Sequence, residues 1–217
     1  MQSTKSSRTG ELLPSTTRKT IEAAFQEAAS ILASGNLSPL YGIARASAYH
    51  QRFSPRNRLL LWGQAPHARM VRGAQGWKAL RREVLPGAPA YLVIAPQQGG
   101  YGLLKVYDVS FTRGRSVRLT PASVRLASLF SANREAAAGE AAGLIEGTGL
   151  EAELARVALL YALGLFPWYQ ASLRAGERLE ERQLFRVAEN ALKRADRALK
   201  VLENKARTAR EAERRAA

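Results

Sequence analysis

Residues 50–96 read HQRFSPRNRLLLWGQAPHARMVRGAQGWKALRREVLPGAPAYLVIAP, and within this stretch helical patterning gives way to strand-like patterning. Ser54 and Pro55 suit the cap and the first turn of a helix that continues through three leucines to Trp62. From Ala68 onward, short β-prone runs are separated by glycines and prolines, which is typical of strands joined by turns. The stretch therefore predicts an α+β fold with a small sheet.

The elements around this stretch extend the same prediction. We expect strands at residues 69–72, 90–94 and 103–109. The GlnGlnGlyGly segment at 97–100 has the composition of a hairpin loop, so the sheet should be antiparallel. Upstream, apolar residues recur with helical spacing from Thr16 to Gly35, and a second helix is expected around 40–50.

After Thr120 the strand patterns stop, and the rest of the chain is expected to be all helical. Its last segment repeats apolar residues in alternating steps of three and four, the seam of a coiled coil: Phe185, Ala188, Leu192, Ala195, Leu199, Leu202, Ala206 and Ala209. This alanine-rich seam needs a partner, either the helix from Leu150 or another subunit, and the second choice predicts a homodimer. We divide the chain into a flexible tail (1–15), an α+β domain (16–120) and a helical region (121–217) for packing or oligomerisation.

Composition excludes several classes of protein. The chain has 217 residues, 46% of them hydrophobic and 24% charged, so it should fold around a real core. It has no cysteine and two histidines, which leaves no disulfide framework, thiol nucleophile or cysteine-based zinc site. The N-terminus lacks an apolar signal segment, and we expect a cytoplasmic, nucleoid-associated protein with no membrane partner.

Charge is the strongest functional signal. The net charge is +15, and residues 51–120 carry twelve basic against two acidic residues, a local net charge of +10. So many like charges repel one another unless an anion compensates them, which points to nucleic acid. Of the 33 basic residues 26 are arginine; coding bias toward GC-rich codons explains that ratio equally well but not the clustering.

Aromatic residues are interleaved with these cations, which suits an unpaired strand whose bases are free to stack. The candidate DNA-binding residues are Arg52, Phe53, Arg56, Asn57, Arg58, Arg72, Trp77, Lys78, Arg81 and Arg82. The cations would neutralise phosphates, while Phe53 and Trp77 would stack on bases. A core role is the alternative for both rings, and Asn57 has a structural alternative on its leucine-rich helix.

The same region resembles the N-terminal domain of the ArdC-type antirestriction proteins over about 60 residues. The matching residues are Phe53-x-x-x-Asn57-x-Leu59-Leu60-Leu61-x-x-Gln64-x-Pro66, Val71-x-Gly73, Trp77, Leu80, Arg82-x-Val84, Gly87, Ile94-Ala95-Pro96 and Tyr107-Asp108-Val109-Ser110-x-Thr112. The resemblance implies a single-stranded-DNA-binding domain of the kind found in plasmid- and phage-associated proteins.

The chain also departs from that family. Arg81 stands where glycine is usual, Pro86-Gly87-Ala88 replaces Lys-Gly-Glu, and Phe111 replaces a glutamine. Full-length relatives carry a zinc metallopeptidase domain with His-Glu-x-x-His, whereas His50 and His67 are 17 residues apart and cannot form that site.

These observations predict a non-enzymatic single-stranded-DNA-binding protein with little sequence preference, acting in DNA protection, repair or mobile-element biology. We expect no metal and no cofactor, because Glu83 and Asp108 are the only acids of residues 51–120 and no catalytic set accompanies them. RNA and duplex DNA stay open as further partners. The alternative function is a structural protein that bridges duplex DNA and dimerises through its C-terminal helix.

Overall fold

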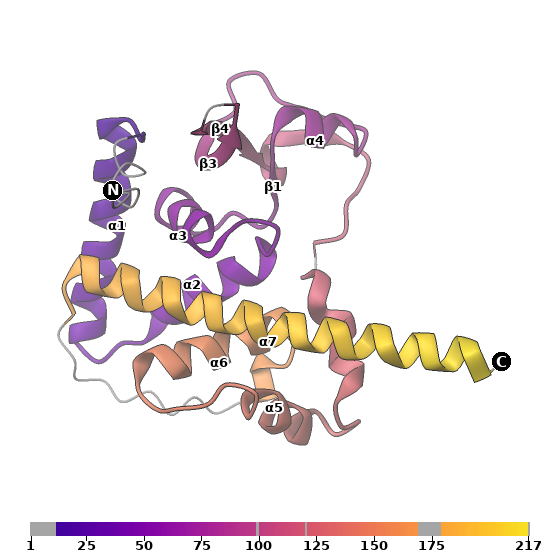
Figure 1. Cartoon of the computed structure of the whole chain (residues 1–217). Coiled ribbons are helices and arrows are strands. Elements are labelled where there is room, and N and C mark those ends of the chain that lie inside the picture. The colour runs from indigo at the N-terminus through magenta and orange to yellow at the C-terminus, as the bar shows by residue number, and fades with distance from the viewer. Residues whose placement is uncertain (1–11, 99, 120, 169–178, 217) are drawn as a thin grey trace, which may run out of the picture.

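The computed structural model describes residues 12–98, 100–119, 121–168 and 179–216 and confirms the α+β prediction (Figure 1). Residues 1–11 of the expected tail lie outside the described residues. The helices are α1 (Ser15–Ala33), α2 (Ser38–Tyr49), α3 (Pro55–Gln64), α4 (Ala74–Lys78), α5 (Arg134–Ala142), α6 (Leu150–Leu163) and α7 (Glu181–Ala216), with 3-10 turns η1 (Val109–Phe111), η2 (Ala122–Leu129) and η3 (Phe166–Trp168). The strands are β1 (Val71–Arg72), β2 (Arg82–Val84), β3 (Tyr91–Gln97), β4 (Gly100–Asp108) and β5 (Thr112–Gly114).

The start of α3 follows its sequence signals. The Ser54 hydroxyl accepts a hydrogen bond from the backbone N–H of Asn57, and Pro55 occupies the first turn, where its missing N–H costs nothing. The hydrogen bond of Ser54 and the position of Pro55 confirm the predicted cap. They also fix where the polar side chains of α3 point, because each residue advances the helix by a set rotation.

The sheet is antiparallel, with strand order β1–β4–β3. Strands β3 and β4 form the predicted hairpin, with pairing from Tyr91↔Val106 to Gln97↔Gly100. Strands β2 and β5 form a separate two-stranded ribbon whose register runs from Arg82↔Gly114 to Val84↔Thr112. The sequence predicted neither β2 nor β5 as a strand.

Two side-chain amides of α3 close the outer edge of β3. Asn57 Nδ2 donates to the Ile94 carbonyl at 2.7 Å, and Asn57 Oδ1 accepts from the Ile94 N–H at 2.9 Å. Gln64 makes the same pair of bonds with Leu92, both at 2.9 Å. An amide offers the donor and acceptor of a peptide group, so the two residues replace the neighbouring strand that β3 lacks on this side.

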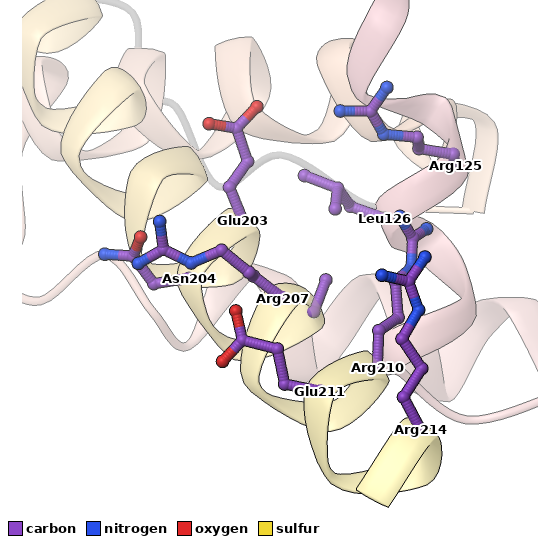
Figure 2. A pocket seen from close by; sticks show the side chains of 9 residues that line it. Arg125, Leu126, Glu203, Asn204, Arg207, Arg210, Glu211 and Arg214 are labelled. Carbon is purple, nitrogen blue, oxygen red and sulfur yellow. The ribbon is translucent and has the colours of Figure 1, made fainter.

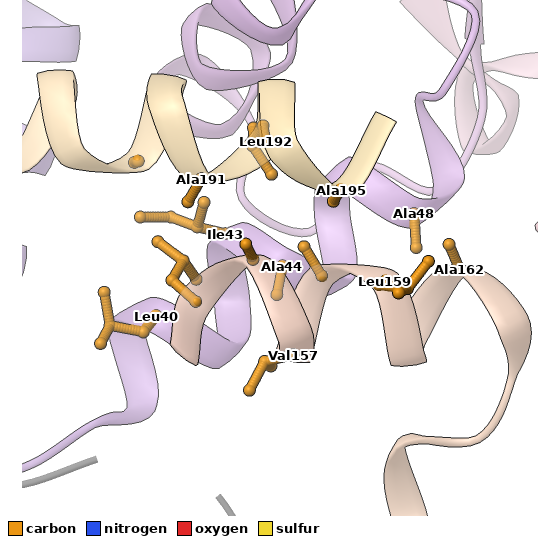
Figure 3. Close-up of a cluster of buried hydrophobic side chains, with 14 of the residues drawn as sticks. Leu40, Ile43, Ala44, Ala48, Val157, Leu159, Ala162, Ala191, Leu192 and Ala195 are labelled. Atoms are coloured by element: carbon orange, nitrogen blue, oxygen red, sulfur yellow. The ribbon is translucent and has the colours of Figure 1, made fainter. Parts of the chain in front are cut away.

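The main core lies where α6, α7 and α2 meet (Figure 3). Alanines at the contact, such as Ala44 and Ala195, let the helix backbones approach closely, and leucines such as Leu159 and Leu192 fill the space beside them. Residues 16–120 and 121–217 both contribute to this core. The regions on either side of the predicted division near residue 120 therefore differ in sequence pattern but share one core.

The predicted apolar seam of the C-terminal helix packs against other helices of the same chain. Ala188, Leu192, Ala195, Leu199 and Leu202 are all buried in the main core. Phe185 is half-buried and packs on Phe25 of α1, with ring centroids 5.1 Å apart. Of the two partners expected for the seam, the one observed is the body of the same chain, including the helix from Leu150.

An ion pair between a buried arginine and a half-buried aspartate joins α3 to α7. The Arg58 side chain is 2% exposed; its Nη2 contacts the Asp196 carboxylate, and its Nη1 donates to the Ser47 hydroxyl at 2.8 Å. Burial lowers the pKa of Arg58 and raises that of Asp196, while their mutual attraction opposes both shifts. The prediction that Arg58 contacts phosphate is corrected here, because its guanidinium is enclosed and neutralised within the protein.

None of the described helices combines the length and the apolar composition that crossing a bilayer requires.

We predict that Asn57→Leu and Gln64→Leu each lower the free energy of unfolding by about 2 to 4 kcal/mol, because each leaves a backbone N–H and C=O of β3 without a partner. Urea unfolding followed by circular dichroism measures the loss. Gln75→Leu is the control: Gln75 is exposed on α4, so its replacement should change stability by less than about 0.5 kcal/mol. A loss as small as the control's in both variants would contradict the role of the amides.

Candidate nucleic-acid interface

Two of the predicted contact residues belong to the interior. Trp77 has no exposed surface, and its indole Nε1 donates to the Tyr107 carbonyl at 2.9 Å, which joins α4 to β4. Its ring offers no face to a base, so the stacking role is corrected to a structural one. Asn57 is 8% exposed and fully engaged with β3, so its predicted DNA contact is corrected in the same way.

Arg82 is also used within the protein. Its Nε donates to the Thr112 hydroxyl at 2.8 Å, its Nη2 to the Thr112 carbonyl at 2.7 Å, and its Nη1 to the Gly114 carbonyl at 3.2 Å. The guanidinium therefore ties β2 to β5. Its predicted phosphate contact is corrected, because most of its donors are already bound to backbone.

Arg81 adopts a conformation that side chains rarely take. Its φ of 56° lies in the left-handed region that favours glycine. Gly114 lies directly beside it, and a Cβ on Gly114 would come within 2.3 Å of the Arg81 carbonyl oxygen. The side chain of Arg81 is nonetheless exposed, so it stays a candidate contact at the edge of the β2–β5 ribbon.

Four arginines gather in one pocket of about 460 Å³, which we call the arginine pocket. Residues from three segments of the chain line it: the end of α2 and the turn that follows (Ala48, Tyr49, Gln51 and Arg52), Arg69–Arg72 at β1, and Arg118–Leu119 in the connection to η2. Its charged residues are Arg52, Arg69, Arg72 and Arg118, and among the residues that the structure describes no aspartate or glutamate lines it.

The electrostatics of this pocket favour an anion. The Nε of Arg72 is buried and has no hydrogen-bond partner within the described part of the chain. Burial lowers the pKa of Arg72, and the nearby charge of Arg52 lowers it further. An anion placed between the two arginines would satisfy the buried donor and offset the repulsion of like charges.

Asp108 pairs with Val71 of the pocket wall, and both oxygens of its carboxylate accept hydrogen bonds. Its Oδ2 accepts from the backbone N–H groups of Arg69 and Met70 at 2.9 and 3.1 Å. Its Oδ1 accepts from the N–H and the hydroxyl of Ser110 at 3.0 and 2.7 Å. The carboxylate thus holds the backbone that carries Arg69 and Met70 at the wall of the pocket.

Aromatic rings lie beside the arginines. Tyr49 lines the pocket and is half-buried. Phe53 is half-buried against the smaller core cluster around Leu61, and the Arg52 guanidinium lies 5.7 Å from the centre of its ring. Tyr101, on the β3–β4 hairpin, is 63% exposed. The structure therefore keeps Phe53 as a candidate for stacking and adds two tyrosines.

Of the predicted cations, only Arg52 and Arg72 line the arginine pocket. Arg56, Lys78 and Arg81 are exposed but lie outside it. Sequence reasoning missed Arg118 as a site residue and did not select Arg69. Arg69 stands in the basic stretch and could have been chosen, whereas Arg118 follows no motif and comes near the others only through the fold.

No protein-family model, no curated protein and no solved structure matches this chain. The resemblance to the ArdC-type domain therefore stays a prediction, and the argument for function depends on the geometry of the pocket.

His50 is a buried histidine two positions before Arg52 in the sequence. Its side chain is 1% exposed, and burial lowers its pKa to about 4, with the charges of Arg58 and Arg52 acting in the same direction and Asp108 against it. The folded protein thus holds a neutral imidazole, whereas the unfolded chain takes up a proton below about pH 6.5. Stability is fully present above that pH and falls as the pH drops toward 4.

We predict that acidification from pH 6.5 to pH 4 removes up to about 3 kcal/mol of stability through His50, since one pKa unit corresponds to about 1.4 kcal/mol. In His50→Gln that component should be absent, while His67→Gln, at an exposed histidine, should keep it. Urea unfolding at several pH values compares the three proteins. An equally steep loss in His50→Gln and the wild type would assign the acid sensitivity to other groups.

Proposed function

We propose that this protein binds single-stranded DNA, with little sequence preference and without catalysis, through the arginine pocket. One observation carries the proposal: four arginines from three separate segments line a pocket that no acid lines, and one of them has a buried Nε without a partner. Charged groups arranged in this way lack an anion to balance them.

A nucleic-acid backbone supplies such an anion repeatedly. Arginine presents a planar fork of donors that matches phosphate oxygens, and the 51–120 region carries most of the excess positive charge of the chain. The resemblance to the ArdC-type domain points the same way. DNA protection or repair, and a cytoplasmic, nucleoid-associated location, are part of this proposal.

The aromatic rings favour a single strand over a duplex. Tyr49 lines the pocket and Phe53 lies beside Arg52, where an unpaired base could stack while its phosphate meets an arginine. A duplex hides its base faces and would gain less from these rings. The duplex-bridging alternative needs a dimer through α7, but the apolar seam of that helix as far as Leu202 is buried within the chain.

The proposal assigns no catalytic role to Asp108. Both of its carboxylate oxygens accept hydrogen bonds from the Arg69–Met70 backbone or from Ser110, so it acts as a structural residue of the pocket.

We predict that Arg52→Gln/Arg69→Gln/Arg118→Gln weakens binding of a short single strand at least about tenfold. The salt dependence of binding should also fall by about two in the slope of log K against log salt, because each lost phosphate contact removes about 0.7. Fluorescence anisotropy of labelled single-stranded and duplex oligonucleotides measures both quantities. Tyr49→Leu should weaken the single strand by about fivefold or more and leave the duplex nearly unchanged.

Lys19→Gln/Arg182→Gln/Arg186→Gln is the matched control, since these exposed cations lie outside the pocket and the change in net charge is the same. Equal losses in the two triple variants would mean that overall charge, rather than the pocket, drives binding. Duplex binding as tight as single-strand binding, with no effect of Tyr49→Leu, would overturn the preference for single strands.

A further inference from the structure

The C-terminal end of α7 extends beyond the core that holds the rest of the helix. Leu202 is its last fully buried residue, and from Glu203 to Arg215 the helix is largely exposed. Figure 1 shows this end projecting past the other elements. Alanine is its only apolar residue type after Leu202, so hydrophobic burial gives no reason for the helix to continue.

A second cleft lies between this end of α7 and η2 (Figure 2). It measures about 480 Å³ and has Leu126 and Ala206 among its lining residues. The charged residues of the lining are Arg125 from η2 and, from α7, Glu203, Arg207, Arg210, Glu211 and Arg214. We call it the arm cleft.

The helical repeat aims two of these arginines at η2. Leu202, Ala206, Arg210 and Arg214 follow one another at intervals of four, so they lie on one face of α7. The earlier part of this face, up to Leu202, is buried. Figure 2 shows Arg210 and Arg214 on the side of α7 where Arg125 and Leu126 lie. At the C-terminal end of this face, Arg210 and Arg214 therefore lie across the cleft from Arg125.

Like charges at this spacing destabilise an isolated helix by a few tenths of a kcal/mol per pair. Within the described part of the chain, the ion pairs include none of Arg125, Arg210 and Arg214, although Glu203 and Glu211 are close enough to line the same cleft. Arg125, Arg210 and Arg214 are therefore gathered without an ion pair among the described residues, in a cleft that two glutamates also line, unlike the arginine pocket.

The two arginine clusters are connected. Arg118 lines the arginine pocket and Arg125 lines the arm cleft, and the two lie only seven positions apart in the sequence. Even fully extended, seven residues span no more than about 25 Å. A strand that leaves the pocket along this segment therefore reaches the cleft within a few nucleotides, whereas a compact acidic ligand would fill only one of the two sites.

We propose that the arm cleft is a second phosphate-contacting surface, which lengthens the path of a bound single strand from Arg118 past Arg125 to Arg210 and Arg214. This inference rests on the proposed function and extends it by stating how long the binding site is. Short strands occupy the arginine pocket alone, and longer strands engage both surfaces and gain affinity from the second.

The test compares oligothymidylates of about 8 and about 30 nucleotides, lengths below and above the usual footprint of one small binding domain. In Arg125→Gln/Arg210→Gln/Arg214→Gln we expect binding of the long strand to weaken about fivefold or more, with the short strand changed less than about twofold. Glutamine keeps the helix propensity of arginine, so circular dichroism should show α7 intact.

Lys200→Gln/Lys205→Gln/Arg215→Gln is the matched control, because it removes three exposed cations of the same helix that do not line the cleft. Equal losses in both variants, or an unchanged long strand in the cleft variant, would overturn the inference. The inference would also be overturned if poly-glutamate of equal charge displaced the labelled long strand as effectively as unlabelled long strand does. That result would point to an acidic protein partner.

The proposed function and this inference fail in different ways. If neither strand binds the wild type at low salt, the proposed function is wrong. If the arginine-pocket variant loses the short strand while the arm-cleft variant keeps the full affinity for the long one, the pocket stands and only the inference falls.

Discussion

The hydrogen bonds from Asn57 and Gln64 to the edge of β3 hold the sheet to α3, and the arginine pocket, which β1 of that sheet helps to line, depends on that attachment. The two residues lie on α3, whose Arg58 is fastened to Asp196 of α7. One helix thus fixes the sheet on one side and the longest helix on the other. With both in place, β1 and the segment before η2 come close enough to the end of α2 to form the arginine pocket.

Much of the fold could be predicted from local signals. Ser54 and Pro55 marked the start of α3, the 97–100 loop marked the hairpin, and apolar spacing marked α1, α6 and α7. The β5 strand could not be predicted, because its three residues, Thr112–Gly114, have no alternating pattern and pair with β2 thirty residues earlier. A short strand of this kind is defined by its partner and by the Arg82 guanidinium rather than by its own sequence.

The site was harder to predict because a sequence does not show which arginines are buried. Arg58 and Arg82 look like their neighbours in the basic stretch, yet one faces Asp196 and the other the backbone of β5. Trp77 likewise has a core role that only the fold reveals. The pocket joins Arg52 to Arg118 across 66 positions of sequence, and no motif links them. Composition points to an anionic ligand, while only the structure shows which arginines line one pocket.

The central claim is that single-stranded DNA lies along the arginine pocket, and ultraviolet cross-linking of an oligothymidylate followed by peptide mass spectrometry tests it most directly. The account predicts adducts in the segments around Tyr49, Arg69–Arg72 and Arg118, because bases stacked beside the pocket touch these residues. Adducts confined to the outer face of α1, with none in the three pocket segments, would place the nucleic acid elsewhere and contradict the account.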